Sequence, residues 1–164
     1  MADQFNAEEV LLMAEQIERN GQEFYRKAAE AVDDTDTSKL LSDLSEWEKG
    51  HEVLFASIRK GLSAEEMEST AIDPYCEEAL YLQTMADEHV FNRQTLESIT
   101  DAVKGRSPEE LIDMAVAFEK DSLLFFLGLE RLVARSTGKD KVFKVIDEEI
   151  GHISYLERAR RKLP

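Results

Sequence analysis

The sequence has a single cysteine, Cys76, which excludes several kinds of site. One thiol forms no disulfide within the chain and cannot supply a four-cysteine zinc or iron site. Proline and glycine are scarce, and no apolar run approaches the roughly 18 residues that would span a membrane. The first residues carry neither the basic nor the apolar segment of a secretory leader. We therefore expect a cytoplasmic protein that does not enter a membrane.

Positive charge is also scarce. The 20 lysines and arginines are outnumbered by 35 aspartates and glutamates, which gives a formal net charge of −15. Binding to nucleic-acid phosphates needs clustered basic residues, so no nucleic-acid partner is expected. Metal cations are the expected small partners. The one basic run, Arg158–Lys162, is interpreted as the favourable end of a helix.

Helical periodicity is what the sequence has in abundance. Apolar residues recur every three to four positions, and Ser107-Pro108-Glu109-Glu110 has the pattern of a capped helix start. The predicted long helices cover about residues 7–32, 38–60, 108–135 and 139–161. Between the second and third, about 46 residues need structure of their own, and Asp73-Pro74 favours shorter helices between about 74 and 104. The prediction is one all-α domain, 1–164, with two hairpins joined by a long helical crossover.

A repeat relates the two hairpins. Glu48-x-x-His51 recurs 101 residues later as Glu149-x-x-His152, and a glycine precedes each histidine. The same offset places Glu18 on Glu119. Each half therefore has a lone glutamate on its first helix and a Glu-x-x-His pair on its second, and the pair lies on one helix face.

If the hairpins pack face to face, four carboxylates and two imidazoles meet in the core. Such a cluster is costly without compensation, because buried carboxylates lose hydration and repel one another. Two divalent cations would balance the charge, and oxygen with imidazole nitrogen suits iron or manganese. This ligand pattern is typical of ferritin-like carboxylate bundles. The alternative is a metal-free polar network, but two matching Glu-x-x-His motifs favour a metal pair.

Four segments carry a resemblance to a known family. They read IERNGQEFY at 17–25, EWEKGHEVLF at 46–55, FEKDSLLFF at 118–126 and DEEIGHISYL at 147–156. The chain resembles the rubrerythrin-like branch of the ferritin-like superfamily, whose fold is a four-helix bundle. The resemblance implies terminal metal ligands at Glu18 and Glu119, bridging carboxylates at Glu48 and Glu149, and one imidazole per metal. Those imidazoles are His51 and His152.

The same resemblance implies a non-haem di-iron oxidoreductase, with two iron ions that react with hydrogen peroxide or dioxygen in oxidative-stress defence. Manganese or zinc are alternative ions, and a homodimer is expected. The chain has no rubredoxin-like four-cysteine domain, so turnover needs an external electron donor such as a rubredoxin-like protein. Peroxidase-type members carry an extra carboxylate where this chain has Ser122 and Leu123. Iron binding, storage or ferroxidase activity is therefore the alternative.

Some residues near the motifs have two interpretations each. Glu15, one turn before Glu18, could assist the cluster, although a solvated position is favoured. Tyr25 and Phe126 could shield the metals or pack the core, and the Tyr25 hydroxyl could donate a hydrogen bond. Gly50 and Gly151 indicate either close helix approach or room for a small oxidant.

Other residues are assigned ordinary roles. Asp147 and Glu148 are expected to be surface acids, and Trp47 to pack the core or a dimer interface. A surface or packing role is favoured for His89, and a buried, unreactive thiol for Cys76.

Overall fold

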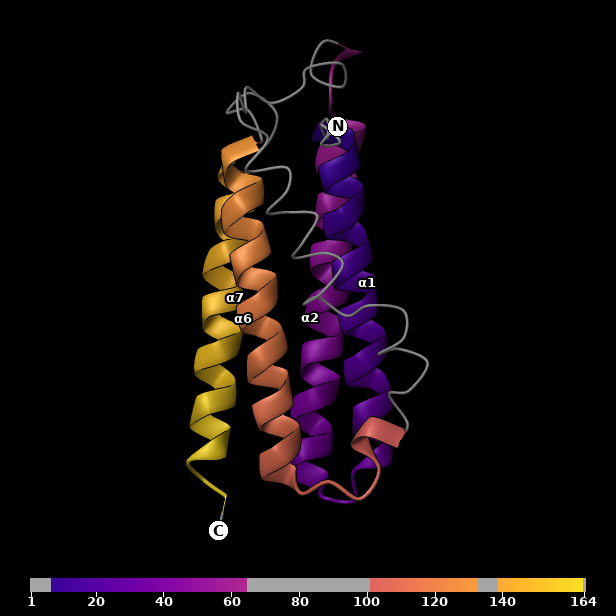
Figure 1. Ribbon diagram of the computed structural model, residues 1–164, viewed down its shortest axis with the longest axis vertical. Helices are drawn as coiled ribbons and strands as arrows, with labels where there is room; N and C mark the ends of the chain where they lie inside the picture. The colour runs from indigo at the N-terminus through magenta and orange to yellow at the C-terminus, as the bar shows by residue number, and fades with distance from the viewer. Residues whose placement is uncertain (1–6, 65–100, 133–138, 164) are drawn as a thin grey trace, which may run out of the picture.

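The computed structural model describes residues 7–64, 101–132 and 139–163, which contain four long helices (Figure 1). Their bounds are Ala7–Ala31 for α1, Thr35–Lys60 for α2, Pro108–Leu132 for α6 and Lys139–Arg160 for α7. All four predicted helices are confirmed, and their starts agree with the predicted ones to within three residues. Residues 101–103 are helical as well, while residues 65–100 of the predicted crossover lie outside the described residues.

The helix starts follow from capping side chains. α2 begins before its predicted start because the Asp34 carboxylate accepts hydrogen bonds from the Thr37 backbone N–H at 2.8 Å and its hydroxyl at 2.6 Å. The polar run that ends α1 therefore also starts α2. At α6 the predicted capping box is present: Ser107 N–H donates to Glu110 at 2.8 Å, and Glu110 N–H donates to the Ser107 hydroxyl at 3.2 Å.

The helices form two antiparallel hairpins. α1 packs mainly against α2, and α6 packs mainly against α7. In Figure 1, α2 ends at the upper end of the bundle and α6 begins at the lower end, so these two helices run in the same direction. This is the relation that a crossover between hairpins requires. No helix in the described part of the chain combines the length and apolar character needed to cross a membrane.

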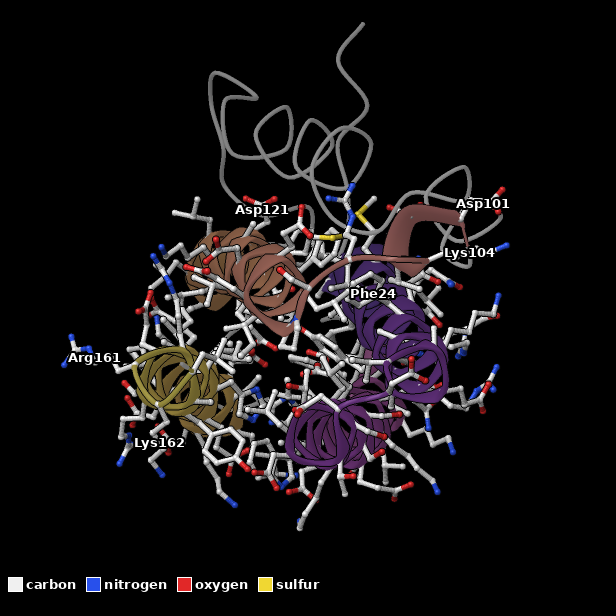
Figure 2. All side chains as sticks on the ribbon, turned by 90° about the horizontal axis from the view of Figure 1, so that it is seen from below. Phe24, Asp101, Lys104, Asp121, Arg161 and Lys162 are labelled. Atoms are coloured by element: carbon white, nitrogen blue, oxygen red, sulfur yellow. The ribbon has the colours of Figure 1, made fainter. Side chains whose placement is uncertain are left out.

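Aromatic side chains join the hairpins. Phe24 lies edge-on to Phe118 with ring centroids 4.6 Å apart, and Phe55 stacks on Phe126 at 5.0 Å. Burial of such a side chain contributes roughly 1.5–3 kcal/mol. Viewed along the bundle, Phe24 lies among the helices whereas Arg161 points outward (Figure 2). These contacts hold the two hairpins face to face and so position the polar residues between them.

Candidate metal centre

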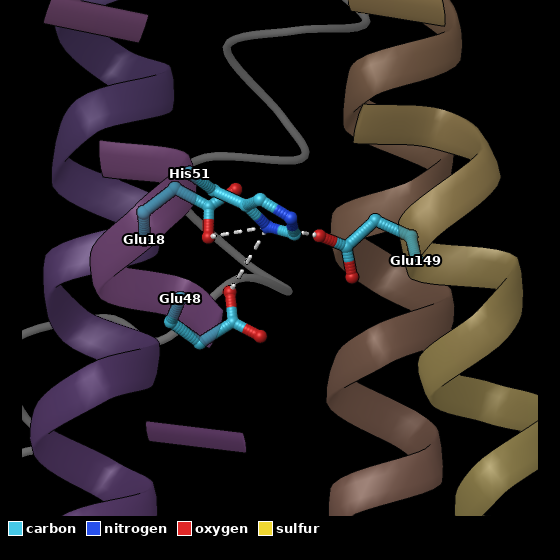
Figure 3. Close-up of side chains that lie close together, drawn as sticks. All are labelled: Glu18, Glu48, His51 and Glu149. Carbon is cyan, nitrogen blue, oxygen red and sulfur yellow. Dashed lines mark ion pairs between the residues drawn. The ribbon is translucent and has the colours of Figure 1, made fainter. Parts of the chain in front are cut away.

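Six buried polar residues meet midway along the bundle, and they are the six that the sequence singles out: Glu18, Glu48, His51, Glu119, Glu149 and His152. Each is at most 6% exposed. Each hairpin contributes one glutamate from its first helix and a Glu-x-x-His pair from its second. In Figure 3, the residues from α1 and α2 face Glu149 of α7 across the bundle.

The six side chains form two groups of four. One group contains Glu18, Glu48, His51 and Glu149, and the other contains Glu48, Glu119, Glu149 and His152. Within each group, one ligand atom per residue lies within 4.8 Å of the others. Glu48 and Glu149 belong to both groups. The arrangement therefore offers two adjacent positions for ions, with two carboxylates in common.

The shortest contact in the cluster crosses between the hairpins. His51 Nδ1 lies 2.9 Å from Glu149 Oε1 and 3.6 Å from Glu18 Oε2. His152 Nδ1 lies 3.4 Å from an oxygen of each of the three carboxylates in its group. Both imidazoles thus present the same ring nitrogen to the cluster, and each nitrogen faces three carboxylates.

The cluster contains buried polar atoms that have no hydrogen-bond partner. They are both carboxylate oxygens of Glu18 and of Glu149, Oε1 of Glu48, and Nδ1 of His51. Every such atom found among the described residues belongs to this cluster. Leaving a buried polar group unpaired costs about 1–3 kcal/mol, so the concentration of these atoms at one place fits a site that holds a ligand. Oxygen and imidazole donors fit divalent first-row metals, and four carboxylates balance two such ions.

The four carboxyl groups divide into two pairs with opposite pKa shifts. Burial, reinforced by the charge of Glu48, raises the pKa of Glu18 and Glu119 well above the usual value for glutamate. Burial acts in the same direction on Glu48 and Glu149, but their contacts with the other two carboxyls and with the imidazoles outweigh it and lower the pKa of both. Without metal, the cluster favours two protonated and two ionised carboxyls.

Both imidazoles favour the protonated form when no metal is bound. Burial alone would lower the pKa of each, but the surrounding carboxylates outweigh it, raising the pKa of His152 to about 12 and also raising that of His51. Two imidazolium ions then balance two carboxylates. The metal-free cluster is therefore neutral. With two divalent ions and four ionised carboxylates it would be neutral again, so metal binding would release four protons, two from carboxyls and two from imidazoles.

Tyr25 donates a hydrogen bond to the cluster. Its hydroxyl lies 2.6 Å from Glu119 Oε1, and its side chain is almost fully buried. Burial, together with the charge of Glu119, raises the pKa of Tyr25 well above its ordinary value, so the phenol keeps its proton. The hydrogen-bond interpretation is therefore confirmed. Phe126, at the equivalent place in the repeat, stacks on Phe55 instead.

Glu148 contacts the outer ring nitrogen of His51, and the sequence did not indicate this contact. Glu148 Oε2 lies 2.8 Å from His51 Nε2, although the Glu148 side chain is 41% exposed. Glu148 is partly exposed and lies outside both ligand groups, as predicted for a surface acid, but the prediction missed its contact with His51. Asp147 is exposed as expected. An acceptor at Nε2 keeps a proton there and leaves Nδ1 free to bind a metal.

Trp47 covers the other imidazole from outside. Its ring stacks on that of His152, with centroids 4.9 Å apart and planes 15° apart. The indole is 39% exposed, so Trp47 is not part of the core, and the alternative that it packs a dimer interface stays a prediction. Trp47 and Glu148 are equivalent positions in the repeat, each one residue before the glutamate of a Glu-x-x-His motif. That shared position draws attention to both residues in the sequence, but it does not specify the imidazole that each one contacts.

Glu15 does not belong to the cluster. It is buried, which contradicts the favoured prediction of a solvated residue, and its Oε1 lies 2.5 Å from Nε of Arg59 on α2. The guanidinium compensates the buried carboxylate. His89 and Cys76, the other two residues assigned ordinary roles, lie outside the described residues.

A groove of about 750 Å³ runs between α2 and α7, outside the two imidazoles. Its volume is within the range of small-molecule sites. Gly50 and Gly151 line it, and a Cβ at either position would meet no atom within 4 Å. The interpretation that these glycines permit close helix approach is therefore wrong. They leave open space beside the histidines.

We expect alanine at these two positions to stabilise the protein. A glycine inside a helix loses more backbone freedom on folding than alanine does, and neither methyl group would clash, so Gly50→Ala with Gly151→Ala should add about 1–2 kcal/mol. Urea unfolding of the metal-free protein measures the change. A loss of stability in either single variant would contradict the prediction and indicate that the local backbone requires glycine.

Comparisons with known proteins agree with the architecture. No protein-family model and no curated protein matches the chain. A solved structure described as a ferritin-like diiron-carboxylate protein, from Thermotoga maritima, is similar over 99% of both chains, with a TM-score of 0.75 and 23% sequence identity. At this identity the likeness establishes the fold. The chain thus has the predicted all-α, ferritin-like fold, with a buried carboxylate and imidazole cluster compatible with di-iron binding.

Proposed function

We propose that the protein is a non-haem di-iron oxidoreductase of rubrerythrin type, which reduces hydrogen peroxide or dioxygen at the centre of the bundle. The observation that carries the proposal is the pair of overlapping ligand groups that share Glu48 and Glu149. When bound, a pair of irons supplies two electrons, the number that reduces one peroxide and two protons to two water molecules.

Each cluster residue has a role in this proposal. Glu18 and Glu119 would each hold one ion, and Glu48 and Glu149 would serve both positions. Each imidazole would bind through Nδ1, the nitrogen that faces the carboxylates. Carboxylates suit this task because each offers two oxygen atoms and a negative charge to the ions. Tyr25 holds a proton beside Glu119 and orients that carboxylate.

An external reductant is part of the proposal, because one cysteine cannot form a four-cysteine, rubredoxin-like iron site within the chain. The groove between α2 and α7 brings the outer edges of both imidazoles close to the surface. A small rubredoxin-like electron carrier is the expected donor.

The experiment that tests this function is anaerobic addition of hydrogen peroxide to protein reconstituted with ferrous iron. We expect about two irons per chain, a change in absorption on oxidation, and repeated turnover once a reduced rubredoxin-like donor is supplied. A fully loaded centre without steady-state peroxide consumption would favour the alternative, which is metal binding, storage or ferroxidase activity. Less than about one metal per chain after reconstitution would exclude both.

A further inference from the structure

The surroundings of the two ion positions differ, although the repeat makes their ligands equivalent. The offset of 101 residues pairs each position near one imidazole with an equivalent position in the other half. The six cluster residues match. Among the residues that contact them from outside are Trp47, Glu148 and Tyr25. Trp47 and Glu148 are equivalent positions in the repeat but differ in type, and the equivalent of Tyr25 is Phe126.

The first pair makes the imidazoles unequal. Glu148 places a carboxylate 2.8 Å from the outer nitrogen of His51. Its counterpart Trp47 stacks flat on His152 and offers no negative charge. In the described part of the chain, no carboxylate from outside the cluster pairs with His152. A carboxylate behind a metal-binding imidazole raises its basicity and fixes its orientation, so His51 is the stronger ligand.

The second pair makes the terminal carboxylates unequal. Glu119 Oε1 accepts the Tyr25 hydrogen bond at 2.6 Å, which occupies one of its lone pairs and draws off charge. Neither oxygen of Glu18 has a hydrogen-bond partner, and the counterpart Phe126 has no hydroxyl to offer. Glu18 is therefore the stronger ligand of the two, and it belongs to the same group as His51.

We propose that the position formed with Glu18 and His51 binds a divalent metal more tightly, and fills before the position formed with Glu119 and His152. The inference rests on the proposed metal centre and adds an order of filling to it. Both differences act in the same direction, because His51, the imidazole with a carboxylate behind it, and Glu18, the carboxylate without a hydrogen-bond partner, belong to the same ion position. At one metal per chain, the ion occupies the Glu18 position.

Titration of the metal-free, full-length protein with Mn²⁺ tests the order, because electron paramagnetic resonance distinguishes a single ion from a coupled pair. We expect the first equivalent to give an uncoupled spectrum and the second to convert it into that of a spin-coupled pair. Calorimetry of the same titration should resolve two steps, the first at least about tenfold tighter.

Matched substitutions identify which position fills first. Glu119→Gln should retain the tight step and lose the weak one, whereas Glu18→Gln should lose the tight step. Glu148→Gln should weaken the tight step by about 10–100-fold, with Asp147→Asn, an equal charge change one residue away, as its control.

Removal of the tyrosine hydroxyl tests the second difference. Tyr25→Phe should raise the affinity of the weak binding step and so reduce the difference in affinity between the two steps. Tyr155→Phe, which removes a hydroxyl outside the cluster, should leave both affinities unchanged. Circular dichroism checks the fold of every variant. If Glu148→Gln does not fold, the Glu18 and Glu119 substitutions still decide the question.

Two results would overturn the proposal. One is a spin-coupled pair from the first addition of Mn²⁺, and the other is a tight step that survives in Glu18→Gln and disappears in Glu119→Gln. Both would leave the metal centre itself intact. Absence of Mn²⁺ binding in the parent protein would instead remove the metal centre, and the order of filling with it.

Discussion

Replacement of Glu149 by glutamine is expected to reduce the metal content from about two ions per chain to well below one, whereas Glu18→Gln should lose about one. Glu149 belongs to both ligand groups, and its side chain is fully buried, so no water replaces the lost carboxylate. Glu18 belongs to one group only. Elemental analysis after removal of free metal gives the content of each variant.

Glu15→Gln is the matched control for these substitutions. Glu15 is also a buried carboxylate, but its partner is Arg59 and it lies outside both groups. Its replacement should leave the metal content at the parental level. Equal losses in Glu149→Gln and Glu18→Gln would contradict the shared role of Glu149. Thermal stability that does not respond to added metal in the parent protein would favour the alternative of a metal-free polar network.

Loading the metal-free protein with two divalent ions is expected to release about four protons, because four of the six ligands are protonated beforehand. Burial and charge raise the pKa of Glu18 and Glu119, and the carboxylates raise the pKa of His51 and His152. Metal must displace these protons, so the overall affinity for two ions should fall by up to about 10⁴-fold per unit decrease in pH. An indicator dye in weak buffer counts the protons, and release of fewer than about one per ion would contradict the scheme.

The stability of the metal-free protein provides an independent measurement of the same protonation. Because the pKa of His152 rises from 6.5 unfolded to about 12 folded, its stabilising effect is complete below 6.5 and is lost as pH rises toward 12. The metal-free protein should therefore become less stable as the solution becomes alkaline. Zinc-loaded protein, in which the imidazoles are already deprotonated, should not show this loss. Thermal unfolding across that range compares the two.

The helices and the six cluster residues could be predicted from the sequence, because both depend on local spacing. A Glu-x-x-His motif puts two side chains on one helix face whatever surrounds it, and its repetition shows that two such faces must meet. Capping at Ser107 follows in the same way from neighbouring residues. None of these predictions required knowledge of which helices become neighbours.

The contacts of Glu148, Trp47 and Glu15 could not be predicted in this way, because each depends on a partner from another helix. Glu148 lies beside the buried face of α7, and only the approach of α2 brings His51 to within 2.8 Å of Glu148. Glu15 becomes buried because Arg59 of α2 reaches it with a compensating charge. Composition and periodicity describe one helix at a time, whereas such contacts depend on how two helices pack together.

The sharing of Glu48 and Glu149 has a consequence for the assembly of the molecule. Each hairpin supplies three residues of one ligand group and one carboxylate of the other group. Neither hairpin can therefore complete an ion position alone. A bound metal would therefore require both hairpins to be docked correctly, and it would link two halves that otherwise pack mainly within themselves. Two identical hairpins placed face to face would present the same six ligands. Joining both hairpins in one chain allows the sequences of the two halves to diverge.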